Sequence, residues 1–202
     1  MKTKELKRLT QGAADRSADL ATSLVDLAGD RGLLDVAIGT VSSPVGDLLV
    51  AVTPRGLVRV AFLEENRDRV LGELARRLSP RILESAKATQ DVRRELDEYF
   101  AADRTRFDLR IDRRLVQGMQ RDVLSATGRV AYGRLATYGE IAKRIGRPTA
   151  ARAVGRALGA NPIPIVIPCH RVVGAGGSLT GYGGGLDRKA LLLRLEGALL
   201  DA

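Results

Sequence analysis

Three runs of β-forming residues near the start of the chain restrict the fold more than any other sequence feature. They are Asp35–Val41, Asp47–Thr53 and Leu57–Leu63, and each is rich in Val or Leu. Ser43–Gly46 and Pro54–Gly56 separate the runs, and both have the composition of tight turns. Because strands joined by such short connections pair antiparallel, the sequence predicts a small antiparallel sheet.

The rest of the chain is predicted to be mainly helical. Residues 65–79 and 87–101 have helical spacing and complete a domain over 35–112. Residues 113–202 form a second, mostly helical domain, and 202 residues suffice for two such units. Residues 1–34 are polar with scattered leucines, which indicates a helical N-terminal extension of unknown role. The expected fold class is α+β, with the small antiparallel sheet and its helices first and the helical domain second.

A helix-turn-helix is predicted inside the second domain. Thr137 and Glu140 have capping-box spacing at the start of a short helix, which Gly146 and Pro148 end. The helix that follows, 150–160, is rich in Ala and Gly. Such a pair resembles the motif that places a helix in a DNA groove. The alternative is a helical corner with no contact to DNA.

The distribution of charge favours an anionic partner for the second domain. The net charge is +9, with 19 Lys/Arg against 18 Asp/Glu in residues 1–111 but 14 against 6 in residues 112–202. No apolar run approaches the roughly 18 residues that span a membrane, so nucleic acid is the favoured partner and no membrane is expected. A basic surface without a partner is the alternative.

Glycines in the second helix of the motif have two interpretations. Gly155 and Gly159 each cost a helix about 1 kcal/mol relative to Ala. They permit either tight packing against another helix or close approach to DNA, with Arg152 projecting near the helix start. The sequence alone leaves both open.

The chain has one cysteine and one histidine, and they are adjacent. Cys169 and His170 follow Pro162, Pro164 and Pro168, which exclude a helix interior and stiffen the segment. A nearby imidazole can take a thiol proton and leave a better nucleophile. Neighbouring side chains of an extended chain point to opposite faces, so contact needs a bridging water or a turn. The alternative is a cysteine that serves as a small buried hydrophobe.

The same residue counts limit other chemistry. A single cysteine forms no internal disulfide, which indicates a cytosolic protein. One histidine, one cysteine and scattered carboxylates do not make a tetrahedral metal site, so neither metal nor cofactor is expected.

A glycine-rich stretch follows the cysteine. Seven of residues 174–189 are Gly, and Tyr182 among them indicates a pocket wall, although a flexible surface loop has the same composition. Asp187 is predicted to cap a last helix. Glu196 late in that helix either orients an imidazole or is a solvated surface residue.

These residues together resemble a known family. Asn161–Val173, with Pro168-Cys169-His170-Arg171 at its centre, is similar to the active-site signature of O6-alkylguanine-DNA alkyltransferases, also called methylated-DNA–protein-cysteine methyltransferases. The similarity covers roughly residues 35–198 and includes the following segments: Tyr138–Ala142, Ala150–Gly155, Gly181-Tyr182 and Leu195–Gly197. The Pro-Cys-His-Arg core in this context is highly specific.

The resemblance implies a single, irreversible transfer of an alkyl group from the O6 oxygen of guanine to Cys169, without cofactor or metal. The partner would be double-stranded DNA containing O6-alkylguanine. The chain would be monomeric and cytoplasmic, as in bacterial members, and would associate with the nucleoid when it acts.

The resemblance also implies roles for individual residues. His170 would be the base for Cys169 through a water, Glu196 would orient His170, and Asn161 would brace the turn before the cysteine segment. Further residues would line the guanine pocket or meet DNA. The pocket residues would be Tyr138, Tyr182, the backbone of Gly183 and the carbonyl of Val172. The DNA-binding residues would be Arg152, inserted into the base stack, with Ala151, Gly155 and Tyr138.

Three positions depart from the family pattern. Met119 and Leu124 stand where Phe and Trp are frequent, which affects packing, and Gly183 stands where eukaryotic members have Ser.

Two other functions are weighed against this one. A non-catalytic protein of the same fold would bind alkylated DNA, but such members lack the reactive cysteine. A cysteine hydrolase would use Cys169 and His170, for which adjacent residues have poor geometry.

Overall fold

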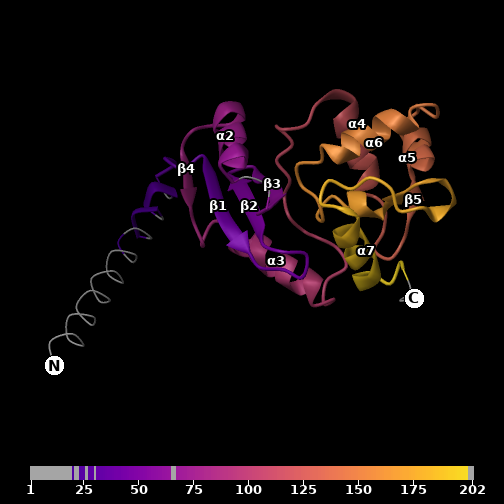
Figure 1. Ribbon diagram of the computed structural model, residues 1–202. Coiled ribbons are helices and arrows are strands. Elements are labelled where there is room, and N and C mark those ends of the chain that lie inside the picture. The colour runs from indigo at the N-terminus through magenta and orange to yellow at the C-terminus, as the bar shows by residue number, and fades with distance from the viewer. Residues whose placement is uncertain (1–19, 21–22, 26, 30, 65–66, 200–202) are drawn as a thin grey trace.

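The computed structural model describes residues 20, 23–25, 27–29, 31–64 and 67–199. Two lobes are visible in Figure 1, a sheet with two helices and a helical lobe that ends the chain. The described residues 20, 23–25 and 27–29 are helical, and the remainder of the predicted extension up to residue 30 lies outside the described residues.

The sheet has four strands in the order β3-β2-β1-β4. The strands are β1 (Val36–Val41), β2 (Leu48–Thr53), β3 (Gly56–Phe62) and β4 (Ile82–Glu84). The first three form the predicted antiparallel meander, so the α+β prediction is confirmed. The sheet differs from the predicted antiparallel one in an additional strand, β4, which pairs parallel with β1 after a helix returns the chain to the same end.

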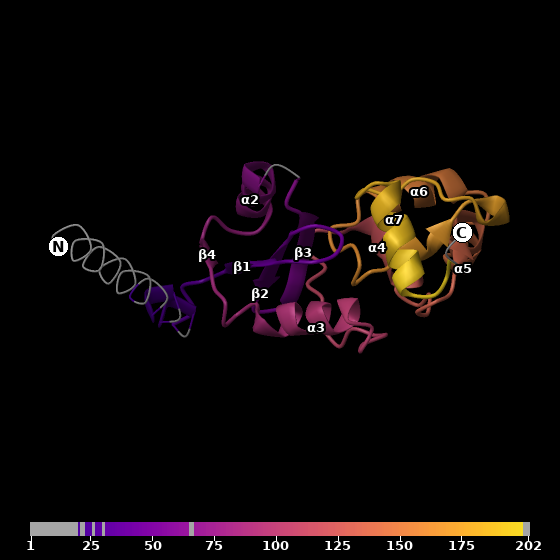
Figure 2. The same cartoon turned by 60° about the horizontal axis from the view of Figure 1, so that its bottom comes forward.

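Two helices cover the sheet on opposite faces (Figure 2). They are α2 (Arg67–Arg77) and α3 (Gln90–Phe100). Alternate residues of β2 divide between them, since Leu49 belongs to the cluster that includes Val70 and Leu74 of α2, and Val50 to the one that includes Leu96 of α3. All of β2 is buried. The cluster around α3 continues into the helical lobe, so one core joins both lobes.

The helical lobe contains four α-helices among the described residues. They are α4 (Gly118–Thr127), α5 (Tyr138–Arg144), α6 (Ala151–Gly159) and α7 (Leu186–Leu195). The predicted capping box starts α5, because Thr137 accepts from the Glu140 amide and Glu140 accepts from the Thr137 amide. Gly146 turns the chain with φ of 71° before α6. The prediction that Asp187 caps α7 was wrong: Gly185 is the N-cap and Asp187 lies in the first turn.

The edge of the sheet at β3 is held by the second half of the chain. The Leu57 amide donates to the Arg110 carbonyl at 2.8 Å, and Leu57 pairs with Ile111 in a parallel bridge. Further along the strand, the Val60 amide donates to the Pro162 carbonyl at 2.9 Å. The sheet lobe therefore fixes the start of the proline segment that leads to the cysteine.

Candidate active site

The segment that carries the cysteine is a compact loop. Ile165 has a φ of 72°, a left-handed conformation that is costly for a β-branched residue. The loop ends in a 3-10 turn, η1 (Cys169–Arg171), and then in β6 (Val172–Val173), which pairs with β5 (Ala136–Thr137). Cys169 and His170 therefore lie in a turn and not in extended chain. A turn is one of the two arrangements that the sequence left open.

The Cys169 thiol is enclosed and held by an amide. It is 6% exposed, and Asn161 Nδ2 lies 3.1 Å from Sγ. The same amide donates to the Ile167 carbonyl at 2.9 Å, and Asn161 Oδ1 accepts from the Ile163 amide at 3.0 Å. Burial raises the pKa of Cys169 to about 11, although the Asn161 hydrogen bond opposes this. The resting group is therefore a thiol that needs a base.

The imidazole of His170, the next residue of η1, is completely buried. Its Nε2 lies 2.9 Å from Glu196 Oε1, while Nδ1 has no hydrogen-bond partner among the described residues. Burial lowers the pKa of His170 against the opposing effect of Glu196, so the ring is neutral at neutral pH.

Glu196 is a buried carboxylate with several donors. Arg171 reaches it with two nitrogens, Nε to Oε2 at 2.8 Å and Nη2 to Oε1 at 2.9 Å. Burial alone raises the pKa of Glu196, but hydrogen bonds from His170 and Arg171 outweigh it and lower the pKa to about 2. The group is an anion that only accepts.

The state of Glu196 determines that of the imidazole. A carboxylate that accepts from Nε2 requires the proton of neutral His170 to be on that nitrogen. Nδ1 is then an acceptor. His170 is therefore a neutral base that can accept a proton at Nδ1, and it directly follows the protonated thiol in the chain.

A pocket of about 450 Å³ opens beside the sulfur. It is lined by the thiol, the end of α6, the glycine-rich loop and the sheet lobe, through residues such as Cys169, Leu158, Tyr182, Gly183 and Phe62. The Tyr182 hydroxyl is buried without a partner among the described residues. Burial raises the pKa of Tyr182 well above its ordinary value, so this group remains a donor.

A second hollow, of about 460 Å³, lies on the outside of the helix-turn-helix. It brings together the residues expected at DNA, Tyr138, Ala151, Arg152 and Gly155. The Tyr138 hydroxyl donates to the Thr180 carbonyl at 2.9 Å. A Cβ on Gly155 would come no nearer than 3.7 Å to Tyr138, and one on Gly159 would meet nothing within 4 Å. Tight helix packing therefore does not explain these glycines, which favours close approach of another molecule.

The sequence-predicted residues thus form two groups, one around the thiol and the end of α6 and one around the first turns of α6. Cys169, His170, Glu196, Asn161, Tyr182 and Gly183 gather around the thiol or its pocket. Val172 lines neither hollow, and its carbonyl already accepts from Lys189 Nζ at 2.7 Å.

Three residues of the buried cluster around Glu196 and Val172 were not predicted from the sequence. Lys189 is fully buried, Arg171 pairs with Glu196, and Tyr99 of α3 donates to Glu196. A signal existed for Lys189, because its spacing from Leu192, Leu193 and Glu196 puts it on the buried face of α7. Nothing local connects Tyr99 with residues 97 positions away.

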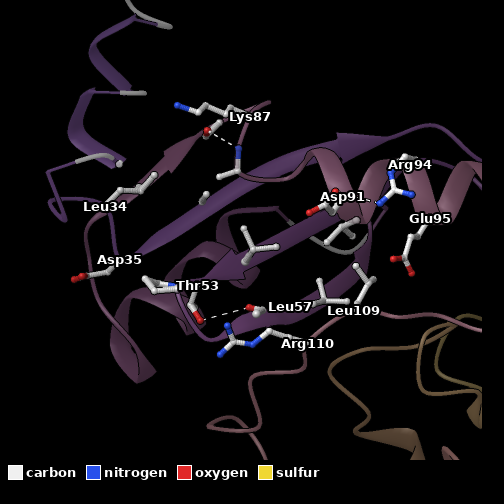
Figure 3. Close-up of a pocket in the computed structure, with 18 of the residues that line it drawn as sticks. Leu34, Asp35, Thr53, Leu57, Lys87, Asp91, Arg94, Glu95, Leu109 and Arg110 are labelled. Atoms are coloured by element: carbon white, nitrogen blue, oxygen red, sulfur yellow. Dashed lines mark hydrogen bonds and ion pairs between the residues drawn. The ribbon is translucent and has the colours of Figure 1, made fainter.

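Another cavity, of about 660 Å³, lies in the sheet lobe among α3, the sheet and residues near 25–35 (Figure 3). It contains none of the predicted site residues. Asp91 and Arg94, on its rim, pair with each other at 3.2 Å.

Two exclusions apply to the described part of the chain. No group of three or more His, Cys, Asp or Glu side chains there could hold a metal ion. No helix there is both long and apolar enough to cross a bilayer.

A helix-turn-helix lobe with an enclosed cysteine, a neutral imidazole and a buried carboxylate defines a class of protein: a DNA-binding fold built around one cysteine nucleophile. Comparison with known proteins narrows the class. Residues 36–113 match the model for "6-O-methylguanine DNA methyltransferase, ribonuclease-like domain" and residues 118–198 the model for the DNA binding domain of the same family. The chain belongs to the 6-O-methylguanine DNA methyltransferase family.

Individual relatives agree with this assignment. A methylated-DNA–protein-cysteine methyltransferase of Mycolicibacterium paratuberculosis is 45% identical over 157 residues, covering 78% of this chain and 90% of that protein. One from Methanosarcina acetivorans is 41% identical over 156 residues, covering 77% and 95%. The crystal structure of Mycobacterium tuberculosis OGT in complex with DNA aligns with a TM-score of 0.68 at 40% identity, covering 81% of this chain and 93% of that one. The expected family is therefore confirmed.

Proposed function

We propose that this protein repairs O6-methylguanine in DNA by transferring the methyl group to its own Cys169. The observation that carries the proposal is the neutral imidazole of His170, held by the Glu196 anion beside the enclosed thiol at the end of a helix-turn-helix lobe. The names of the relatives support the same reaction.

The reaction follows from the site. His170 takes the thiol proton at Nδ1 through a water, and the sulfur attacks the methyl carbon. The new S–C bond forms as the C–O6 bond breaks, and its electron pair stays on guanine, which takes up a proton. The Tyr182 hydroxyl donates to the base and stabilises the developing negative charge. The thioether product is stable, so each molecule acts once.

Recognition requires the damaged base to leave the stack, at a cost of a few kcal/mol. We assign Arg152 to the gap that the base leaves, and Ala151 and Gly155 to the helix face in the minor groove. Tyr138 meets the extruded nucleotide, and the Gly183 backbone and Val172 carbonyl line its pocket. The proposed partner is double-stranded DNA, bound by a cytoplasmic monomer whose working units are 35–112 and 113–202.

Intact-protein mass after incubation with an O6-methylguanine duplex tests the proposal. The wild-type protein gains one methyl group on the peptide that contains Cys169, and never a second. Cys169→Ala gains none and keeps its affinity for the duplex, because removing one buried sulfur leaves the DNA-binding face unchanged. Unmodified wild-type protein that still binds the lesion would instead support the non-catalytic function. Multiple turnover on an ester would support a hydrolase.

A further inference from the structure

Tyr99 connects the sheet lobe to the reacting groups. It lies on α3, which runs along one face of the sheet and belongs to the other lobe from the cysteine (Figure 2). Its side chain is completely buried, and its hydroxyl donates to Glu196 Oε1 at 2.6 Å. The oxygen that accepts this bond is the one that faces His170 Nε2 at 2.9 Å. A single atom therefore separates Tyr99 from the imidazole.

The tyrosine ring is fixed on several sides. The rings of Phe100 and Phe107 lie 5.2 Å away, and Tyr132 meets it edge-on at 6.2 Å. Burial, followed by the charge of Glu196, raises the pKa of Tyr99 far above its ordinary range. The hydroxyl therefore donates at every physiological pH and cannot exchange roles with the carboxylate.

We propose that Tyr99 is a positioning residue for methyl transfer, which acts through Glu196 on the proton affinity and orientation of His170. The assignment rests on the proposed function for its kinetic consequence. Its effect on the imidazole follows from geometry, since Tyr99, His170 and Arg171 all donate to Oε1 and share its lone pairs. The bond from Tyr99 weakens the pull of that oxygen on the His170 N–H and so favours the neutral ring.

Other charged and titratable groups also surround Glu196 and His170. Glu196 also faces Arg171 of η1 and the Tyr132 ring before β5, over which the Arg171 guanidinium lies at 5.8 Å. His170 faces the Tyr182 ring at 6.4 Å, and Lys189 of α7 is close enough to help lower its pKa. None of these groups is hydrogen-bonded to the Tyr99 hydroxyl. Removing that hydroxyl therefore removes only its hydrogen bond to Glu196.

Tyr99→Phe tests the proposal because it keeps the ring and removes the donor. The chain has one histidine, so the NMR titration of its imidazole reports His170 directly in the free protein. We expect its pKa to rise by about half a unit, since the carboxylate becomes a stronger acceptor. The acidic limb of single-turnover methyl transfer against pH moves by the same amount. The maximal rate falls about fivefold with unchanged duplex affinity, because the carboxylate loses a fixed partner.

Tyr132→Phe is the matched control. Its hydroxyl donates to the Leu195 carbonyl at 2.9 Å, one residue before Glu196, and misses the carboxylate. It should destabilise the fold comparably while leaving the titration and the pH profile unchanged. The proposal is overturned if Tyr99→Phe leaves the histidine titration at the wild-type position, or if both variants shift it equally. Absence of transfer by wild-type protein would refute the proposed function, and the titration would still decide the role of Tyr99.

Discussion

Asn161 illustrates how one side chain fixes the nucleophile. Its amide nitrogen donates to both the Ile167 carbonyl and the Cys169 sulfur, and its amide oxygen accepts from the Ile163 backbone amide. The loop between these residues includes the left-handed Ile165, and the amide supplies hydrogen bonds that an irregular buried loop would otherwise lack. The sulfur position is therefore set by the start of its own loop.

Arg152 is the residue whose proposed task is easiest to isolate. It is exposed at the start of α6, so its replacement leaves the core intact. Arg152→Ala should lower the single-turnover rate about tenfold more on duplex than on single-stranded substrate, because only the duplex has a stack to fill. Arg156→Ala, exposed one turn later, is the control for loss of charge. Equal losses on both substrates would contradict the insertion.

At this scale the sequence predicted a good part of the site. Cys169, His170 and Asn161 belong to one local motif, and Glu196 lies at the end of a leucine-rich helix. Their roles stay predictions, whereas their proximity is a property of the structure. Tyr99 was unpredictable because it meets Glu196 only through the docking of two lobes.

Among the elements, the start of α7 shapes the pocket wall. Gly185 begins the helix with φ of 90°, and Gly184 lies against the Phe62 ring. Arg188 then places its guanidinium 4.6 Å from the centre of the same ring and donates to the Val45 carbonyl at 2.6 Å. The glycine-rich loop is thus clamped to the sheet lobe.

Gly184→Ala should disturb this clamp. Its Cβ would lie 2.5 Å from Phe62 Cε2 and 2.8 Å from Tyr182 Cε1, so one ring must move. We expect a loss of about 1–3 kcal/mol in the free energy of unfolding, measured by urea denaturation, with slower transfer. Gly155→Ala, whose Cβ has room, should be neutral or stabilising in the same assay. Equal stability of the two variants would contradict the account.

Elements whose pattern is local were predicted, and those decided by packing were not. The meander and the α5 capping box follow from turn composition and spacing. The short strand β4 has three residues that are partly or fully exposed, so no alternation marks it. Asp187 had the residue type of a cap, but the left-handed Gly185 ends the loop two residues earlier.

The whole molecule is joined by a buried ionic cluster. Glu196 accepts hydrogen bonds from Tyr99 of the sheet lobe and from Arg171 and His170 of the helical lobe. The cluster satisfies its own charges inside one continuous core. Folding, lobe docking and the state of the imidazole are therefore coupled.

This coupling predicts acid sensitivity. The folded pKa of Glu196 is about 2 against an ordinary 4.5, so its stabilisation, up to about 3 kcal/mol, is present above pH 4.5 and lost as the pH falls toward 2. His170, whose pKa is lowered from 6.5, adds a loss that begins below that value. Urea unfolding against pH measures both. Glu196→Gln should be less stable at neutral pH and show a flatter acid limb, whereas an unchanged slope would contradict the assignment.

The enclosure of the thiol also determines how long the unreacted protein stays active. Peroxide and small electrophiles consume cysteines that are exposed and ionised, and this sulfur is neither. A protein with a single reactive sulfur can therefore accumulate in a growing cell without losing that sulfur to oxidation. The reserve declines with the number of lesions met and not with the oxidants encountered in the meantime.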